Sequence, residues 1–271
     1  MKGTPFVKKA LDNINLDLNR HEFTAIIGAT GSGKSTLIQH FNGLLKPDSG
    51  EVLVEGVDTK GRKDQRDLRR KVGVVFQYAQ YQLFEENVYK DIEFGLIKRN
   101  IPPDQRKEKV LNVASLVGLS QASLNASPYD LSGGQKKRAA IAGILVLEPE
   151  ILVLDEPAAG LDPEGTREIF NMIEKLHNDG KCTVILVAHS MELVAYYAKR
   201  IIVLDEGKVV IDGTRDEVYS QNELLVSLGL DIPEVTKIMK KIKQYHPDMN
   251  DKIYTVDDAK EEIMRHIKKR S

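Results

Sequence analysis

The sequence predicts an α/β protein with a mostly parallel sheet, and three observations support that class. A short apolar run, Phe23–Ile27, ends in the glycine-rich loop Gly28–Ser35, which matches the phosphate-binding pattern G-x-x-x-x-G-K-[ST]. Apolar runs then alternate with helical stretches, an order typical of a parallel sheet covered on both faces. A long helical block, about residues 87–147, interrupts this alternation as an inserted subdomain.

The elements follow in order from periodicity and turn signals. Ile14, Leu16 and Leu18 alternate with polar residues and predict a half-buried strand ahead of the loop. The other predicted strands are Glu51–Val57, Val72–Phe76, Ile151–Leu154, Thr183–Ala188, Arg200–Leu204 and Val209–Ile211, the last as a closing hairpin strand. The predicted helices outside the block are Lys34–Gly43, Pro163–Asn178 and Met191–Ala198.

The chain turns helical and rich in charge after about residue 220. We therefore expect one large domain over residues 1–220 and a small helical appendage over residues 221–271. Acidic residues lie among the lysines of this appendage, so we expect a solvated helix face rather than a lipid-binding surface.

Composition narrows the possible classes of function. The 271 residues are 41% hydrophobic and 29% charged, which suits a globular protein with a proper core. A net charge of −1 gives no overall attraction to nucleic acid or anionic lipid. The single cysteine, Cys182, excludes an internal disulfide and predicts an inert core thiol. No apolar run approaches the ~20 residues that span a bilayer.

The glycine-rich loop predicts a nucleoside triphosphate site. Glycines let the backbone wrap around phosphate oxygens, and the helix that follows adds its positive dipole end. Lys34 should reach the β- and γ-phosphates, and the Ser35 hydroxyl should bind Mg²⁺. The alternative is a glycine-rich turn with an exposed lysine. The expected ATP-binding residues here are Gly28, Ala29, Thr30, Gly31, Ser32, Gly33, Lys34, Ser35 and Thr36.

Acidic residues follow a second apolar strand. Asp155 ends Ile151–Asp155 at the edge where ligands bind in open α/β sheets, so we expect it to hold Mg²⁺. Glu156 is the candidate general base that polarises the attacking water. The alternative is an ordinary acidic pair at a strand end. Gln77 and His189 also follow strands and should point toward the same site.

The stretch Leu131–Gln135, Leu-Ser-Gly-Gly-Gln, precedes the acidic strand and opens a predicted helix that continues to Leu147. Ser132 and the amides near Gly134 would form a second anion-binding helix start. A serine-capped helix with a glycine turn is the local alternative.

These motifs together resemble the ATP-binding subunit of an ABC transporter, from about Leu11 to Gly213. The resemblance implies a P-loop NTPase fold that includes an antiparallel β subdomain. It implies that Gln77 touches Mg²⁺ and water and that His189 contacts the γ-phosphate. It also implies a head-to-tail dimer in which one subunit closes the ATP site of the other. The residues with that role would be Ser132, Gly133, Gly134, Gln135 and, in the coupling loop, Asp162.

Three further segments, Tyr81–Glu85, Asp91–Gly95 and Leu228–Val235, are similar to energy-coupling factor (ECF) transporter ATPases. Within that family, Gln82–Phe84 favours the second of the two ATPase types. The alternative for this stretch is a helix start whose Leu83 and Phe84 pack inward. The resemblance implies an ATP hydrolase with ATP and Mg²⁺ as its cofactors.

The same resemblance implies partners and a location. The partners would be a sister ATPase, in a heterodimer or a homodimer, a transmembrane scaffold subunit, and a membrane subunit that captures vitamins or metal ions. The chain would lie peripherally on the cytoplasmic side of the cell membrane, without a transmembrane span of its own and without nucleic acid.

Other functions compete with this interpretation. The chain could serve another ABC importer or exporter, or act as a soluble ABC ATPase on nucleic acid or ribosomes. The neutral charge and the absence of a long coiled coil or second cassette weigh against the soluble class. A small-molecule kinase built on the same phosphate loop would leave Leu131–Gln135 unused.

One departure from the family pattern concerns the adenine base. ABC ATPases carry an aromatic residue that stacks on adenine in a strand before the first one predicted here. Phe6 is the only early aromatic residue. Either Phe6 takes this role, or the chain starts late and lacks both an edge strand and the adenine platform. We expect the late start, with weakened ATP affinity and relaxed base selectivity.

Overall fold

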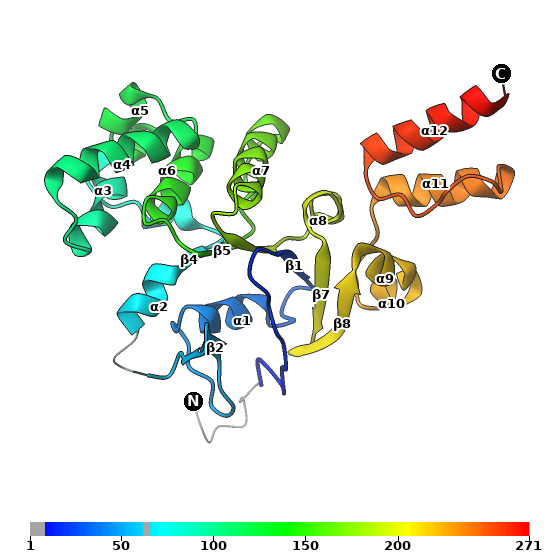
Figure 1. The fold of residues 1–271 in the computed structure, drawn as a ribbon, viewed down its shortest axis with the longest axis horizontal. Coiled ribbons are helices and arrows are strands. Elements are labelled where there is room, and N and C mark those ends of the chain that lie inside the picture. The colour runs from blue at the N-terminus through cyan, green and yellow to red at the C-terminus, as the bar shows by residue number, and fades with distance from the viewer. Residues whose placement is uncertain (1–8, 62–64, 271) are drawn as a thin grey trace. The chain divides into compact units, whose positions relative to one another are not determined.

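A computed structural model of the chain describes residues 9–61 and 65–270 (Figure 1). The chain divides into two compact units. The first unit contains the described residues of Met1–Leu18, Glu22–Lys34 and Leu186–Ser271, and the second contains those of Asn19–His21 and Ser35–Ile185. Phe6, the early aromatic candidate for the adenine site, lies outside the described residues.

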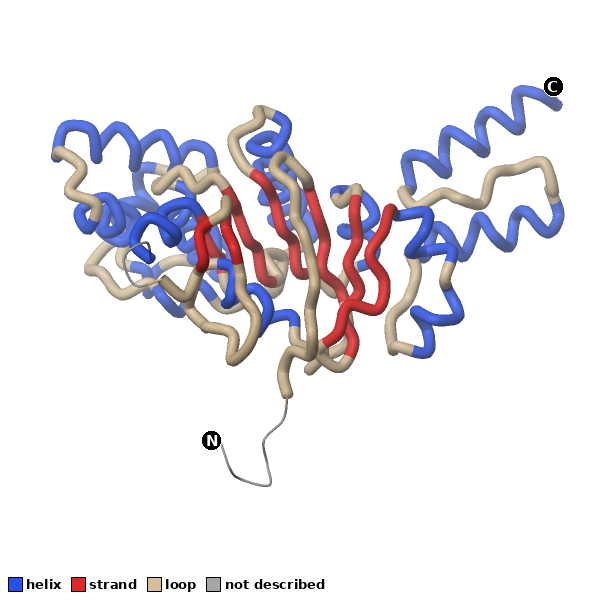
Figure 2. The backbone as a smooth tube through the Cα atoms, turned by 60° about the horizontal axis from the view of Figure 1, so that its bottom comes forward, coloured by secondary structure: helices blue, strands red, loops and turns tan. Residues whose placement is uncertain are grey.

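The described strands confirm the α/β class with a mostly parallel sheet. Six of them are hydrogen-bonded in the order β4-β5-β6-β1-β7-β8, and β2 and β3 form a separate antiparallel pair. β8 runs antiparallel to its neighbour β7, while β1 with β7 and β4 with β5 are parallel. Figure 2 shows these strands in red. Their residues divide between the two units within β6.

The first unit holds the strand before the phosphate loop and everything after β6. Its elements are β1 (Phe23–Ile27), α8 (Met191–Tyr197), β7 (Arg200–Asp205), β8 (Lys208–Thr214), α9 (Arg215–Ser220), α10 (Asn222–Ser227), α11 (Glu234–Tyr245) and α12 (Val256–Arg270). All five residues of β1 are buried, as expected for a central parallel strand. The predicted helix and hairpin strand in this part of the chain are both present.

Apart from Asn19–His21, the second unit begins within the helix that follows the loop. Its elements are α1 (Lys34–Phe41), β2 (Leu53–Val54), β3 (Val57–Asp58), α2 (Gln65–Lys71), β4 (Val72–Val75), η1 (Ala79–Gln82), α3 (Val88–Lys98), α4 (Pro103–Leu116), α5 (Gln121–Asn125), η2 (Pro128–Asp130), α6 (Gly133–Leu145), β5 (Ile151–Asp155), α7 (Pro163–Asn178) and β6 (Thr183–Val187). Helices alone occupy the stretch from α3 to α6 (Figure 1). The exact limits proposed for the domains and the inserted subdomain stay a prediction.

Two predicted strands differ in the structure. Residues Ile14–Leu18 show the predicted alternation of half-buried and exposed side chains but form no strand. Alternating exposure of side chains indicates an extended chain that is buried on one side. A β-strand also requires hydrogen bonds to a neighbouring strand, which the alternation does not reveal. Glu51–Val57 is not one strand but the two-residue pair β2 and β3. Glu55 and Gly56 have φ angles of 51° and 78° and make a tight turn between them.

The two last helices, α11 and α12, run beside each other (Figure 1) and enclose a small core of their own. Met239, Met249, Ile253 and Ala259 are buried in this core, and Val235, Ile242 and Ile263 pack against it. Within residues 9–61 and 65–270, no helix combines the length and apolarity that crossing a bilayer requires.

Candidate functional site

The phosphate loop, Gly28–Ser35, begins directly after β1 at a position where only glycine fits. A Cβ atom on Gly28 would lie 2.2 Å from the carbonyl oxygen of Leu204 and 2.6 Å from the hydroxyl of Ser32. The amide of Ser32 donates to the carbonyl of Ala29 at 3.1 Å, and the carbonyl of Ser32 accepts from Gly207 at 2.9 Å. The loop is therefore held close to the neighbouring backbone, and a Cβ atom at Gly28 would push it out.

Lys34 is the first residue of α1 and is only 7% exposed. Its ammonium donates to the carbonyls of Gly28 at 2.7 Å and Ala29 at 3.0 Å. It therefore lies folded across the loop whose phosphate ligand it is predicted to bind. Thr30 and Gly31 at the loop tip are exposed, which leaves this part of the loop open to a ligand.

Ser35 and Asp155, both predicted Mg²⁺ ligands, meet in the second unit. The Ser35 hydroxyl donates to a carboxylate oxygen of Asp155 at 3.3 Å, and Asp155 is 5% exposed at the end of β5. Two oxygen ligands of this kind suit Mg²⁺, which is usually bound by one or two protein groups together with substrate phosphates. The described residues contain no group of three or more His, Cys, Asp or Glu side chains that could hold a metal by themselves.

Glu156, the predicted general base, follows Asp155 with an unusual backbone. Its φ angle is 53°, in the left-handed region that residues other than glycine rarely adopt. Its carbonyl accepts hydrogen bonds from the amide of Ala159 at 3.1 Å and from the ammonium of Lys137 at 3.3 Å. The same ammonium donates to the carbonyl of Gln77 at 2.7 Å. The structure thus brings Gln77 and Glu156 together through a lysine that the sequence analysis did not select.

The other predicted residues lie in well-defined local positions. His189 is exposed in the first unit, between β6 and α8. Thr36 is half-buried in α1, where its carbonyl accepts from His40 Nδ1 at 2.7 Å. Asp162 is the N-cap of α7, and its carboxylate accepts from the amide of Gly165 at 2.7 Å. Asp162 therefore has a structural role as a helix cap, whatever coupling role it adds.

The Leu-Ser-Gly-Gly-Gln motif forms the start of α6. Ser132 is its N-cap: the Ser132 hydroxyl accepts from the amide of Gln135 at 3.3 Å, and the Gln135 side chain accepts from the amide of Ser132 at 2.9 Å. This reciprocal pair is a capping box. Ser132 and Gly133 are exposed, so the positive end of a 13-residue helix faces outward.

Two of the segments that resemble ECF ATPases contact each other. The carboxylate of Asp91 accepts from the amides of Phe84 at 3.0 Å and Glu85 at 3.2 Å. The rings of Phe84 and Phe94 meet edge to face, 5.0 Å apart. Phe84 is nevertheless 62% exposed while Leu83 is half-buried. Inward packing therefore accounts for Leu83 but not for Phe84.

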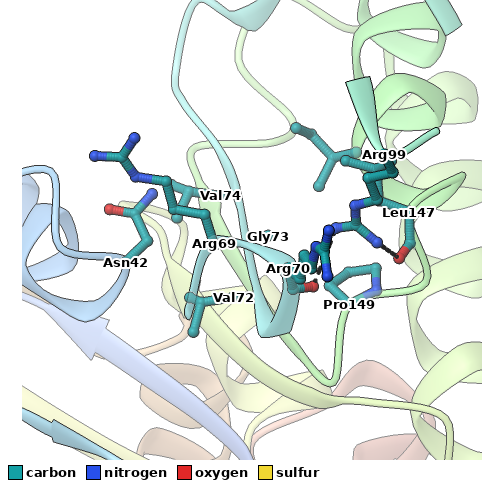
Figure 3. A pocket seen from close by; sticks show the side chains of 10 residues that line it. Asn42, Arg69, Arg70, Val72, Gly73, Val74, Arg99, Leu147 and Pro149 are labelled. Carbon is teal, nitrogen blue, oxygen red and sulfur yellow. Dashed lines mark hydrogen bonds between the residues drawn. The ribbon is translucent and has the colours of Figure 1, made fainter. Parts of the chain in front are cut away.

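A cavity of about 150 Å³ lies elsewhere in the second unit, among α2, β4 and the ends of α3 and α6 (Figure 3). Arg99 crosses its side and donates to the carbonyls of Leu147 at 2.7 Å and Arg70 at 3.3 Å. These bonds join the ends of three helical segments, which gives Arg99 a structural role. None of the predicted site residues lines this cavity.

Comparisons with known proteins place this geometry in a family. The family profile described as "ABC transporter" matches residues 11–159. The chain is 55% identical over 269 residues to the energy-coupling factor transporter ATP-binding protein EcfA2 of Acetivibrio thermocellus, with 99% of this chain and 95% of the relative covered. It is 46% identical to the protein of the same name from Clostridium tetani, with 98% and 93% covered.

Two solved structures resemble the fold. The structure of cbiO1 from Clostridium perfringens, described as part of the ABC transporter complex cbiONQ, has a TM-score of 0.72 and 39% identity, with 85% of this chain and 92% of that chain covered. A dimeric structure of the ATP-binding cassette MJ0796 bound to ADP and Pi has a TM-score of 0.73 and 31% identity, with 79% and 94% covered. The predicted P-loop NTPase fold of an ABC ATPase is thereby confirmed. The chain belongs to the ABC transporter family of ATPases and, within it, to the energy-coupling factor transporter ATP-binding proteins.

Proposed function

We propose that this chain hydrolyses ATP to drive solute uptake through separate membrane subunits. The observation that carries the proposal is the hydrogen bond between Ser35 and Asp155. It links the end of the phosphate loop with the acidic strand, as a site for a metal-bound triphosphate requires. In the proposed site, loop amides cradle the phosphates and Lys34 turns its ammonium from the loop carbonyls to the β- and γ-phosphates.

Mg²⁺ would be held by Ser35 and Asp155, with Gln77 as a further contact. When bound, it supplies charge neutralisation for the β- and γ-phosphate oxygens. Asp155 suits this position because it is buried at the end of a strand and keeps a carboxylate oxygen directed at the Ser35 hydroxyl. His189 would contact the γ-phosphate from the end of β6.

Glu156 is proposed to accept a proton from the attacking water. Its position after a rigid buried strand, with its carbonyl held by two donors, fixes the backbone that carries the carboxylate. General bases need such placement, because proton transfer requires hydrogen-bond distance to the water.

A second ATPase subunit would complete the site. The amides of Gly133 and Gly134 and the hydroxyl of Ser132 lie at an exposed helix start, where an anionic γ-phosphate from a partner subunit would be stabilised. Gln135 and Asp162 would shape this surface as caps of α6 and α7. The partner is a sister ATPase in a head-to-tail heterodimer, or a second copy in a homodimer.

The names of the relatives support the proposal of membrane partners. Their names specify an energy-coupling factor transporter, and the cbiO1 structure is described as part of a transporter complex. We propose a transmembrane scaffold subunit and a substrate-capturing subunit for vitamins or metal ions, with this chain bound peripherally at the cytoplasmic face of the cell membrane.

The experiment is a comparison of wild type with Glu156→Gln, each purified with and without its sister ATPase. The variant keeps the size of the side chain but removes the base, so we expect it to bind Mg-ATP, to lose nearly all turnover and to accumulate as a dimer in size-exclusion chromatography. Lys34→Ala is the control that should lose ATP binding and stay monomeric. Substantial hydrolysis by Glu156→Gln, or an ATP-loaded variant that stays monomeric with its sister present, would contradict the proposal.

A further inference from the structure

Lys137 is a buried cation in α6, the helix that starts with the Leu-Ser-Gly-Gly-Gln motif. It is 1% exposed, and among the largest fully buried side chains of residues 9–61 and 65–270 it is the one that carries a charge. Its ammonium donates to the carbonyls of Gln77 and Glu156, at 2.7 and 3.3 Å. These two residues are 60 and 19 positions away in the sequence. One side chain therefore joins three segments that the proposed hydrolysis uses.

Packing alone gives no reason for a lysine at this position. Burying an ammonium costs free energy that an apolar side chain of similar length would avoid. Burial lowers the pKa of Lys137, and the nearby charges of Asp155 and Glu156 only partly offset that effect. The neighbouring buried residues of the helix, Ala139 and Ile141, are apolar. What Lys137 adds is a set of hydrogen-bond donors directed at two main-chain carbonyls.

Of the two carbonyls, that of Glu156 should be affected more by loss of the hydrogen bond from Lys137. A left-handed backbone at a residue other than glycine is strained and persists only when neighbouring groups hold it. The amide of Ala159 and the ammonium of Lys137 supply the two donors to this carbonyl. Because the carbonyl carbon and the side chain are bonded to the same Cα atom, a shift of the backbone at Glu156 would move the carboxylate with it.

We propose that Lys137 is a positioning residue for ATP hydrolysis, which holds the Gln77 and Glu156 backbones in register with the helix that carries the Ser132 motif. Movement of that helix, for example when a partner's nucleotide engages its start, is then transmitted directly to both residues. The inference rests on the proposed function, because it assumes that Glu156 is the base and that Gln77 contacts the metal and water.

The test uses the full-length chain paired with its sister ATPase. Lys137→Met keeps an unbranched chain of similar length and removes the donors, and Lys137→Arg keeps the charge but displaces it. Lys136→Met is the matched control, since Lys136 lies on the same helix and donates instead to the carbonyl of Tyr129 at 3.3 Å. We measure kcat, KM and the Kd for Mg-ATP, and follow folding by thermal melting.

If loss of the Lys137 donors displaces Glu156, kcat should fall while the affinity for ATP stays nearly unchanged. We expect Lys137→Met to lower kcat by about 100-fold, the size of effect that a misplacement of about 1 Å can produce, with the Kd for ATP within about threefold of wild type. Lys137→Arg should be intermediate in kcat, and Lys136→Met should match wild type. This order, with unchanged ATP affinity, is a pattern that a purely structural role would not give.

Several outcomes would overturn the proposal: wild-type kcat in Lys137→Met, equal losses in the Met and Arg variants, or kcat and ATP affinity falling together. If Lys137→Met does not fold, Lys137→Arg decides: a lowered kcat with unchanged ATP affinity supports the proposal, and a wild-type kcat overturns it, because the placement of the donor group would then not matter for hydrolysis. Failure of the proposed function is distinguishable, since it would appear as an active Glu156→Gln variant.

Discussion

The hydroxyl of Ser35 donates to the carboxylate of Asp155 across 3.3 Å. Both groups are proposed Mg²⁺ ligands, so Asp155→Asn should weaken Mg²⁺-dependent ATP binding. Loss of a charged oxygen partner is worth about 1.5–3 kcal/mol, or roughly 10- to 100-fold in affinity. Nucleotide titration with Mg²⁺ and with a chelator measures the effect. Asp104→Asn, an exposed acid in the first turn of α4, is the control, and equal titrations for the two variants would remove Asp155 from the metal site.

Gly28→Ala should destabilise the protein and abolish ATP binding. Its Cβ atom would lie 2.2 Å from the carbonyl of Leu204, and forcing an extra carbon into packed backbone costs about 1–3 kcal/mol. Gly143→Ala is the counterpart, because a Cβ atom there meets nothing within 4 Å inside α6. We expect that helix substitution to be neutral or stabilising by up to about 1 kcal/mol. Thermal melting of both variants checks this, and a smaller loss for Gly28→Ala than for Gly143→Ala would contradict it.

Cys182 should resist alkylation in the folded protein. The thiol is buried, and that burial raises its pKa to about 11 from 9.0. Because the thiolate is the reactive form, a rise of this size leaves about 100-fold less of it at pH 8. Iodoacetamide labelling followed by mass spectrometry should be slow for the native chain and fast in guanidinium chloride. Rapid labelling of the native chain at pH 8 would show that the thiol is accessible and ionised.

The proposed appendage, residues 221–271, can be tested through its small core. Met239→Ala removes a fully buried side chain between α11 and α12 and should cost about 2–5 kcal/mol. Because that core is formed by residues of α11, of α12 and of the segment between them, limited proteolysis should then cut within this region while Mg-ATP binding persists. Ile238→Ala, one position along and 53% exposed, is the control. Loss of ATP binding in Met239→Ala would argue against an independent appendage.

Local chemistry explains which elements the sequence predicted well. Helix α7 was predicted with its observed limits, because Asp162 caps it and Pro163 occupies its first turn. The prediction of a strand at Ile14–Leu18 was wrong because side-chain alternation carries no information about a hydrogen-bonded partner strand. The prediction of one strand at Glu51–Val57 was wrong because the turn at Glu55–Gly56 was not recognised in the sequence.

In the site, too, residues of contiguous motifs could be predicted from the sequence, whereas a residue whose role depends on tertiary packing could not. The loop around Lys34 and the acidic pair Asp155-Glu156 at the end of β5 are each contiguous in the sequence, so the sequence alone could locate them. Lys137 could not, because the run Lys136-Lys137-Arg138 resembles any basic helix face. Only the packing of the helix against the segments around Gln77 and Glu156 buries Lys137 fully, whereas Lys136 is half-buried.

The left-handed backbone of Glu156 also limits which replacements can serve as clean probes of chemistry. Asparagine and aspartate tolerate this conformation, whereas valine, isoleucine and threonine strongly disfavour it because of the branch at Cβ. A library of substitutions at this codon should therefore separate into two phenotypes. Replacements such as asparagine should fold and bind nucleotide but not hydrolyse it, whereas β-branched replacements should also distort the backbone at this position.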